Sequence, residues 1–389
     1  MDIITRGRSG EKPKIAKKGR GFLLLPLLLL TAALLLFPGR TVEAARAALV
    51  LWARAVVPAL LPFFIVSELL TALGAARLAG RILSPLMRPL FALPGEAALA
   101  VVMGLCCGFP TGAAVTAALR RQGDISPEEG ARLLAFTNNA GPLYLTATAA
   151  SAVLGCPAAA PLLAAGHYGI NLLLGMGLGL LARLRGKGGP GYRWDRDKER
   201  PRSTQQDGAP RPAPPESAPP ALLMKTAAQR AAANLLLIGC YMAFFAAAAA
   251  LLPEGLPPLA HAAGAGLLEM TLGLNAVAES GLSLTALLPL AGAELAFGGL
   301  SVQMQVLAMA ADTDISPRLY LLSRPLHALL AAGFTRWALL RYGLPLAAGG
   351  TAAVPLLTAG GILSRSLAQA GLLTAGWLLA AGLSRKGRS

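Results

Sequence analysis

The segment 108–112, with the sequence Gly-Phe-Pro-Thr-Gly, interrupts the long apolar stretch Phe91–Leu119. Proline lacks an amide hydrogen and glycine adopts backbone conformations that other residues avoid, so this segment predicts a break in a helix. Backbone amides that are exposed at such a break can bind an anion. The segment therefore predicts either a solute-binding site at membrane depth or a loop at the membrane surface.

A second polar segment, Thr-Asn-Asn-Ala-Gly-Pro at 137–142, also lies within an apolar stretch. Two adjacent amide side chains are costly in hydrocarbon unless they find hydrogen-bond partners. Because asparagine both donates and accepts, Asn138 and Asn139 suit a carboxylate, the edge of a base, or a neighbouring helix break. Hydrogen bonding between packed helices is the structural alternative.

The third polar segment is 294–305, with the sequence Glu-Leu-Ala-Phe-Gly-Gly-Leu-Ser-Val-Gln-Met-Gln. It combines an acid, a glycine pair, a serine and two glutamines, and it is the most specific polar pattern in the chain. Residues two apart do not share a helical face, so Gln303 and Gln305 predict an extended or broken segment.

Four charged residues, Glu68, Glu269, Glu294 and Arg324, stand within apolar stretches. A charge at the centre of a membrane helix costs ~2.5 kcal/mol or more, so each should have a partner or a function. We expect Glu294 to pair with Arg324. Alternatively, Arg324 could neutralise an anionic substrate, while Glu269 could bind a coupling proton or Na⁺.

The composition predicts the elements that must position these residues. Of 389 residues, 55% are hydrophobic and 14% are charged. Soluble domains carry about 25% charged residues, so a soluble multidomain enzyme is excluded, and the hydrophobicity excludes a disordered chain. The sequence predicts an all-α polytopic membrane protein embedded in a lipid bilayer. No enzyme motif is present, and four cysteines without CxxC spacing and three scattered histidines predict neither a metal site nor a cofactor.

The net charge of +16 lies mostly in three polar segments. Residues 1–20 and 185–230 each carry +5 and residues 384–389 carry +3, which is 13 of the 16 charges. Nucleic-acid surfaces interleave basic residues with aromatics, but aromatic residues make up only 5% of this chain, so no nucleic-acid partner is expected. Basic segments beside apolar runs follow the positive-inside rule, which predicts that both termini and the linker are cytoplasmic.

The chain is expected to contain a basic leader (1–20), a first membrane half (21–184), a disordered basic Pro-rich linker (185–227), a second membrane half (228–384) and a basic tail (385–389). Apolar stretches of spanning length predict about eight spans, at 22–37, 49–73, 131–154, 157–184, 228–252, 318–339, 344–359 and 362–383. The first stretch could be a signal peptide, but the many apolar stretches that follow favour a retained anchor.

The charge rule further predicts two re-entrant hairpins, at Phe91–Leu119 and Leu282–Ala311. The tetrapeptide Asp-Ile-Ser-Pro at 124–127 recurs at 314–317, and Gly108 recurs as Gly298 at the same offset of 190. The orientation places the first copy inside and the second outside, so we expect an inverted repeat, as in many secondary transporters. An ordinary helix-capping signal also explains the tetrapeptide.

These residues resemble the YlbJ-type sporulation integral membrane proteins, within the wider group that has the nucleoside-recognition Gate domain. The resemblance extends from about residue 45 to about residue 380, and Phe109 stands where the family pattern has tyrosine. The segments that carry it are 108–113, 121–126, 132–139 with Gly141-Pro142, 266–269, 297–302 with Gln305-Val306, and 313–316.

The resemblance implies a transporter in a membrane around the developing spore that passes dipicolinate from the mother cell toward the forespore. The expected substrate-binding residues are Gly108, Pro110, Thr111, Gly112, Asn138, Asn139, Gly298, Gly299, Ser301, Gln303, Gln305 and Arg324. Glu269 and Glu294 are expected to couple an ion or to serve as structural charges. A nucleoside carrier and a non-transporting scaffold for spore assembly are the alternatives, and the chain could form a homo-oligomer.

Overall fold

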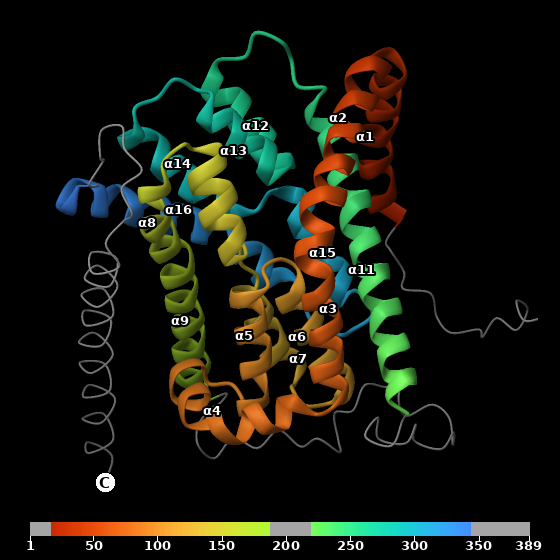
Figure 1. The fold of residues 1–389 in the computed structure, drawn as a ribbon, viewed down its shortest axis with the longest axis vertical. Coiled ribbons are helices and arrows are strands. Elements are labelled where there is room, and N and C mark those ends of the chain that lie inside the picture. Colours follow the sequence, from red (N-terminus) through yellow and green to blue (C-terminus); the bar gives the residue numbers. More distant parts are fainter. Residues whose placement is uncertain (1–16, 187–218, 344–389) are drawn as a thin grey trace, which may run out of the picture.

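The computed structural model describes residues 17–186 and 219–343, and every regular element in these ranges is a helix (Figure 1). The all-α prediction is therefore confirmed. The spans predicted at 344–359 and 362–383, the basic tail, and most of the predicted linker and of the basic leader lie outside the described residues. The helix that follows the linker begins at Pro220, within the segment expected to be linker.

The first half comprises α1 (Lys17–Leu36), α2 (Pro38–Leu51), η1 (Trp52–Val56), α3 (Val57–Ala72), α4 (Ala75–Phe91), η2 (Gly95–Ala97), α5 (Ala98–Cys106), α6 (Thr111–Gln122), α7 (Pro127–Phe136), η3 (Tyr144–Val153), η4 (Pro157–Ala159), α8 (Ala160–Ala164), η5 (Ala165–Gly169) and α9 (Ile170–Leu184). The second half comprises α11 (Pro220–Ala249), α12 (Pro258–Leu268), α13 (Met270–Ala278), α14 (Leu284–Phe297), α15 (Gly299–Ala310) and α16 (Arg318–Tyr342).

Four helical segments in the described part of the chain are long and apolar enough to cross a membrane. They are Pro38–Ala72, Pro157–Leu184, Pro220–Ala249 and Leu284–Ala310. A fifth results if Leu78–Phe91 and Gly95–Cys106, which meet at 94°, are counted together. The predicted span 131–154 is broken, because α7 ends at Phe136 and the next helical residues begin at Pro142.

The first predicted hairpin is present. A Cβ added at Gly104 in α5 would lie 3.3 Å from the Cα of Gly112 in α6. Eight residues of continuous helix would separate these positions by about 12 Å, so the chain reverses between α5 and α6. The reversal lies within residues 107–110, at the break that the sequence predicts.

The second hairpin is not where it was expected. Leu284–Ala310 forms one unit of spanning length, in which Gly298 and Gly299 have positive φ angles of 81° and 68°. The chain reverses earlier, between α12 and α13, where Glu269 is extended (φ −143°, ψ 120°). A Cβ added at Gly273 would lie only 2.2 Å from the Cα of Gly266, so these two helices fold back on each other.

The prediction that the two Asp-Ile-Ser-Pro turns lie on opposite sides of the membrane is wrong. Arg120, beside the first turn, forms an ion pair of 2.7 Å with Asp314 in the second. The prediction assumed a hairpin at Leu282–Ala311, and α14–α15 is a single unit instead. The first turn is a capping box, in which the Ser126 hydroxyl accepts from the Glu129 amide and the Glu129 carboxylate accepts from the Ser126 amide.

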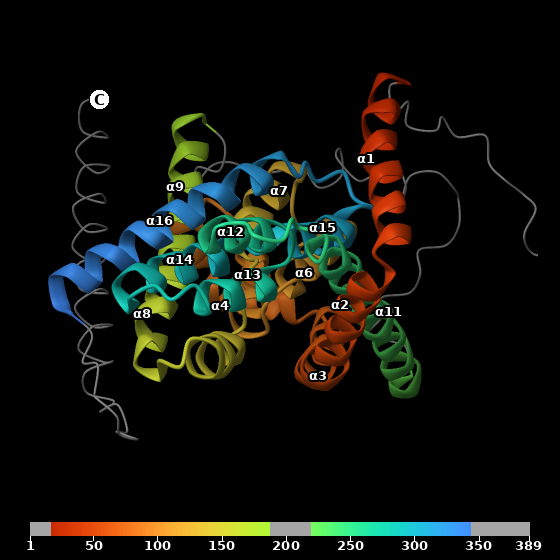
Figure 2. The ribbon, with the colours of Figure 1, turned by 90° about the horizontal axis from the view of Figure 1, so that it is seen from above.

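The two halves nevertheless share an order of elements, a hairpin followed by a broken helix. The hairpin α5–α6 precedes the break after α7, and the hairpin α12–α13 precedes the break between α14 and α15. Figure 1 shows α12 and α13 in the upper part of the bundle and α5, α6 and α7 in the lower part. Seen from above, these elements occupy the centre, between α1–α3 with α11 on one side and α9 on the other (Figure 2).

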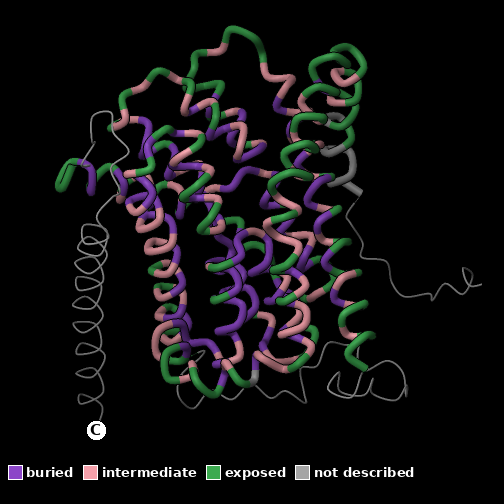
Figure 3. Tube along the Cα trace, in the orientation of Figure 1, coloured by how far each residue is buried: buried purple, intermediate pink, exposed green. Residues whose placement is uncertain are grey.

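Buried residues concentrate where the hairpins and broken helices meet, whereas α1 and α2 are largely exposed (Figure 3). Gly104 and Gly112 make this central packing close. A Cβ added at these positions would lie 1.8 Å and 2.0 Å, respectively, from the carbonyl oxygen of Thr137. Only glycine allows the backbone after α7 to contact the hairpin in this way.

We expect Gly112→Ala to lower the thermal stability of the detergent-solubilised protein. The added methyl group would overlap the Thr137 carbonyl, and such overpacking costs about 1–3 kcal/mol or more. Gly333→Ala is the matched control, because Gly333 also lies within a helix and has no atom within 4 Å of an added Cβ. Equal melting temperatures for the two variants would contradict the close packing.

Candidate substrate site at the helix breaks

The breaks of the first half pack directly against each other. Gly108 has a φ of 85°, and a Cβ added there would lie 2.7 Å from the backbone nitrogen of Gly141. The two polar segments that the sequence singles out, 108–112 and 137–142, are thus brought together. Their contact places the start of α6 beside the end of α7.

Asn138 joins these two helix ends. Its Oδ1 accepts a hydrogen bond of 3.0 Å from the backbone amide of Ala113, and its Nδ2 donates to the carbonyl of Leu134 at 2.8 Å. Of the partners that the sequence suggested, the neighbouring helix break is the one observed. The side chain satisfies one of the amides that the first turn of a helix leaves without an intrahelical partner.

Asn139 pairs with a residue that the sequence reasoning missed. Asn171 in α9 donates from Nδ2 to the Oδ1 of Asn139 at 2.6 Å and to the carbonyl of Phe136 at 2.9 Å. Both asparagine side chains are fully buried. The available signal was an amide within an otherwise apolar stretch, but nothing in the sequence indicated its partner.

Arg324 is fully buried and donates to the carbonyl end of α7. Its guanidinium donates to the carbonyl of Asn138 at 3.2 Å, to the carbonyl of Ala135, and to the Oδ1 of Asn171 at 3.2 Å. A cation is favourable here because the carbonyl end of a helix carries a partial negative charge. The guanidinium also stacks on the ring of Tyr320, 5.1 Å from its centroid.

The predicted Glu294–Arg324 ion pair is wrong. Arg324 points to the end of α7, whereas the Glu294 carboxylate lies against the hairpin α12–α13. A Cβ added at Gly266 would lie 2.0 Å from Oε2 of Glu294, so the carboxylate occupies the space that this glycine leaves free. The two charges therefore belong to different breaks. Glu68 pairs instead with Arg230, at 3.2 Å.

The breaks of the second half also pack against each other. Glu269 caps α13, because its carboxylate accepts from the amides of Thr271 (2.9 Å) and Leu272 (3.0 Å) and from the Thr271 hydroxyl. A Cβ added at Gly299, at the start of α15, would lie 2.9 Å from the backbone nitrogen of Met270. The tip of this hairpin thus contacts the broken helix that follows it.

The two halves meet at Phe109 and Gly298. A Cβ added at Gly298 would lie 3.6 Å from Cζ of Phe109, at the tip of the first hairpin. Phe109 also packs on the buried cluster that contains Ala113 and Val302. The hairpin tip of one half therefore contacts the broken helix of the other.

The sequence predicted an extended or broken segment from Gln303 and Gln305, but these residues lie on a helix, so an extended conformation there is wrong. The conformational break is confined to the glycine pair, and α15 continues regularly to Ala310. The Nε2 of Gln305 donates to the hydroxyl of Ser301 at 3.3 Å. Within the described ranges, Nε2 of Gln303 and Oγ1 of Thr111 are buried and have no hydrogen-bond partner.

Two histidines, for which the sequence predicted no ligand role, support the break after α7. Nε2 of His167 accepts from the amide of Ala140 at 2.9 Å, and the hydroxyl of Tyr168 donates to the carbonyl of the same residue at 2.7 Å. The ring of His327 in turn bonds the carbonyl of His167 at 2.9 Å. His167 and His327 are 160 residues apart, so only the fold reveals this arrangement.

These features define a polytopic helical membrane protein whose two halves each contain a hairpin and a broken helix that meet in a buried polar region. Residues 53–165, which include the hairpin α5–α6 and the Asn138–Asn139 break, match the family described as nucleoside recognition (Gate). No solved structure matches the chain.

The chain is 32% identical, over 335 residues, to the sporulation integral membrane protein YlbJ of Bacillus subtilis (strain 168). The match covers 79% of each chain. The protein therefore belongs to the YlbJ family of sporulation integral membrane proteins, as the sequence motifs predicted.

We expect the Asn139–Asn171 hydrogen bond to be detectable by a double-mutant cycle in thermal unfolding. Asn139→Leu and Asn171→Leu should each lower the melting temperature, because each leaves a buried amide without its partner. The double variant should lose less than the sum of the two, with a coupling of about 0.5–3 kcal/mol. Asn275→Leu, at an exposed position of α13, is the control, and strict additivity would contradict the pair.

Proposed function

We propose that this protein is a secondary transporter that binds a small anionic heteroaromatic metabolite where the four helix breaks meet. The observation that carries the proposal is the contact of Phe109 with Gly298, because it joins the breaks of the two halves. Broken backbone within a membrane is tolerated where protein or a water-filled cavity satisfies it, and secondary transporters bind substrate and ions at such breaks. The opposite placement of the two hairpins supports an inverted arrangement of the halves.

The surroundings of the breaks at 108–112 and 137–142 support the binding of an anion. Arg324 carries a positive charge, and its partners among the described residues are neutral oxygens and the Tyr320 ring. Thr111 and Gln303 retain buried polar atoms with no partner in the described chain, and both could donate to a carboxylate. Phe109 offers an aromatic face at the junction, which suits a flat ring. Dipicolinate, a dianionic pyridine, fits these requirements.

The second half supports the binding of a coupling cation. The carboxylates of Glu269 and Glu294 both lie at the hairpin α12–α13, the first as a helix cap and the second against Gly266. Two neighbouring carboxylates in a medium of low dielectric do not both stay ionised unless a cation joins them. We assign to this pair the proton or Na⁺ that drives transport.

The setting in the cell follows from the family and the charge pattern. The name of the Bacillus subtilis relative points to sporulation, so we place the transporter in a membrane around the developing spore. The basic charge of the termini and the linker supports a cytoplasmic location for these segments. The Gate match favours a nucleoside carrier as the second candidate, because it is described as nucleoside recognition.

Thr111→Val and Gln303→Leu should lower dipicolinate uptake into proteoliposomes at least about tenfold together, which corresponds to ~1.4 kcal/mol of lost substrate interaction. Their melting temperatures should stay near that of the wild type, because neither side chain has a partner in the described protein to lose. Asn138→Leu should instead lower both uptake and stability, because it uncaps α6. Thr226→Val and Gln229→Leu in α11 are the controls.

The uptake assay separates the alternatives. Inhibition of the flux by nucleosides, with no flux of dipicolinate, would establish the nucleoside carrier. A correctly folded protein that moves neither solute, in lipid that supports other transporters, would contradict transport and favour the scaffold.

Glu269→Gln and Glu294→Gln should abolish the dependence of uptake on an imposed proton or Na⁺ gradient while leaving exchange of labelled for unlabelled substrate. Glutamine keeps hydrogen-bonding capacity and size but cannot carry the charge that binds a cation. Glu279→Gln, at the end of α13, is the control. Unchanged gradient dependence in both variants would exclude these residues as the coupling site.

A further inference from the structure

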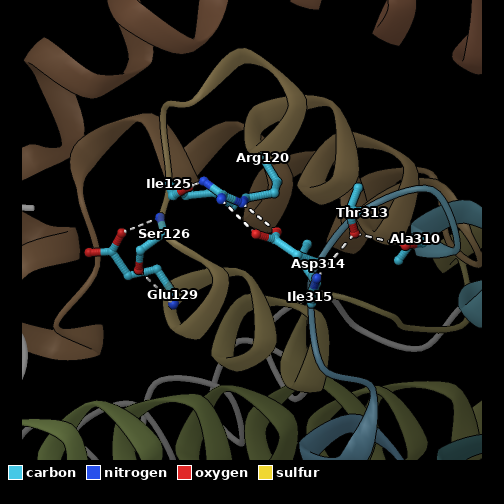
Figure 4. Close-up of polar contacts among 8 residues, drawn as sticks. All are labelled: Arg120, Ile125, Ser126, Glu129, Ala310, Thr313, Asp314 and Ile315. Carbon is cyan, nitrogen blue, oxygen red and sulfur yellow. Dashed lines mark hydrogen bonds and ion pairs between the residues drawn. The ribbon is translucent and has the colours of Figure 1, made fainter. Parts of the chain in front are cut away.

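The two Asp-Ile-Ser-Pro turns are joined by a pair of ion pairs, Arg120–Asp314 and Arg121–Asp312, here called the turn latch. Nε and Nη2 of Arg120 donate to the two carboxylate oxygens of Asp314, at 2.7 Å and 2.8 Å (Figure 4). Nη1 of Arg121 donates to the carboxylate of Asp312 at 2.9 Å. A bidentate contact between arginine and a carboxylate is among the stronger ionic contacts in proteins.

The latch joins the two halves of the protein. Arg120 lies near the end of α6, in the first hairpin, and its Nη1 also donates to the carbonyl of Ile125 at 3.0 Å. Asp312 and Asp314 lie in the turn that follows the broken helix of the second half. Ile315 adds an apolar contact, because its Cδ1 would lie 2.8 Å from a Cβ added at Gly130 in α7.

The latch is separated from the helix breaks by most of one short helix. Arg120 is nine residues from Thr111, which corresponds to about 14 Å along α6. The latch therefore closes the bundle at the open end of the first hairpin, whereas Phe109 and Gly298 close it at the tip. Any movement of that hairpin relative to α15 must stretch both contacts.

The latch is built so that it can separate. The Arg120 side chain is 2% exposed and fixed to its own hairpin, whereas the Asp314 side chain is 49% exposed. Arg121 and Asp312 are 43% and 65% exposed, so water and salt can replace their contact. Separation would release the aspartates into water, while the carbonyl of Ile125 still holds Arg120.

We propose that the turn latch is a gate, which holds the bundle closed at this end and opens to admit solute to the site among the helix breaks. The proposal rests on the transport function proposed above. It makes Arg120, Arg121, Asp312 and Asp314 gating residues, which do not contact the substrate. The opening at this end would alternate with separation of Phe109 from Gly298.

The carboxylate of Asp314 keeps its charge over the ordinary range of pH. The Arg120 guanidinium, hydrogen-bonded to Asp314, holds the pKa of that carboxyl below its usual value of 3.8. A lowered pKa means that the contact is intact above this value and is lost only as the pH falls below it. Acidity in the physiological range therefore does not break the contact between Arg120 and Asp314. A change of ionic strength or of the bound solute would break it.

The gate can be tested by cysteine accessibility in the full-length protein in proteoliposomes. Cys107, which is buried and lies at the first break, serves as the reporter after Cys106, Cys156 and Cys240 are replaced by serine. A membrane-impermeant maleimide is added from each side in turn. We expect Asp312→Asn with Asp314→Asn to raise the labelling rate of Cys107 roughly tenfold, from one side only.

Three further variants make the outcome decisive. The exchange Arg121→Asp with Asp312→Arg should label Cys107 as slowly as the wild type does, because it rebuilds the exposed ion pair with the two charges exchanged. Glu43→Gln removes a remote exposed ion pair with Arg46 and should leave labelling unchanged. If the Asp314 variant does not fold, Asp312→Asn alone and the wild type at about 1 M salt should still show faster labelling.

Unchanged labelling in folded latch variants would overturn the gate and leave a static contact. This result is independent of the proposed transport, because labelling requires no substrate. Flux with unchanged labelling would refute the gate alone. Faster labelling in a protein without flux would support a gated opening and refute the transport function.

Discussion

A helix that ends in apolar surroundings must find partners for the backbone groups that its end leaves free, and this constraint organises the first half of the protein. At the break after α7, Arg324 and Asn171 take up the carbonyls, while His167 and Tyr168 bond both backbone groups of Ala140. Asn138 provides the corresponding cap for α6. Most intramembrane polar side chains around this break therefore hydrogen-bond the backbone. Only a few hydrogen-bonding groups remain for a bound solute.

The partners of the helix breaks also determine how the buried charges are distributed around the contact of Phe109 and Gly298. The break after α7 binds a buried cation, Arg324, whereas the hairpin α12–α13 contacts two acids, Glu269 and Glu294. Because the predicted pair between Glu294 and Arg324 does not form, the positive charge stays at the end of α7 and the negative charges stay at the hairpin α12–α13. This separation supports one region for an anionic solute and another for a coupling cation, with the contact of Phe109 and Gly298 between them.

Much of the fold and of the site was predictable from local sequence. Gly108 and Pro110 predicted a break because their backbone restrictions are local, and Asn138 and Asn139 stood out because amides are rare in apolar runs. The second hairpin was predicted at the wrong position because a helix can end both at the Gly298-Gly299 pair and at Glu269. The local sequence does not show at which of the two the chain reverses its direction. Asn171, His167 and His327 were missed because each takes its role from a residue far away in the sequence.

The sequence by itself determined that the protein is an all-α membrane protein of the YlbJ family, and that a helix breaks at residues 108–112. Hydrophobicity, backbone restriction and motif are properties of neighbouring residues, so no tertiary information was needed. Only the tertiary structure decided which break faces which, that Arg324 bonds carbonyls instead of Glu294, and that the two Asp-Ile-Ser-Pro turns lie together. These outcomes depend on how helices pack across distances of about 190 residues, and the energies that choose among such packings come from close contacts that no local pattern records.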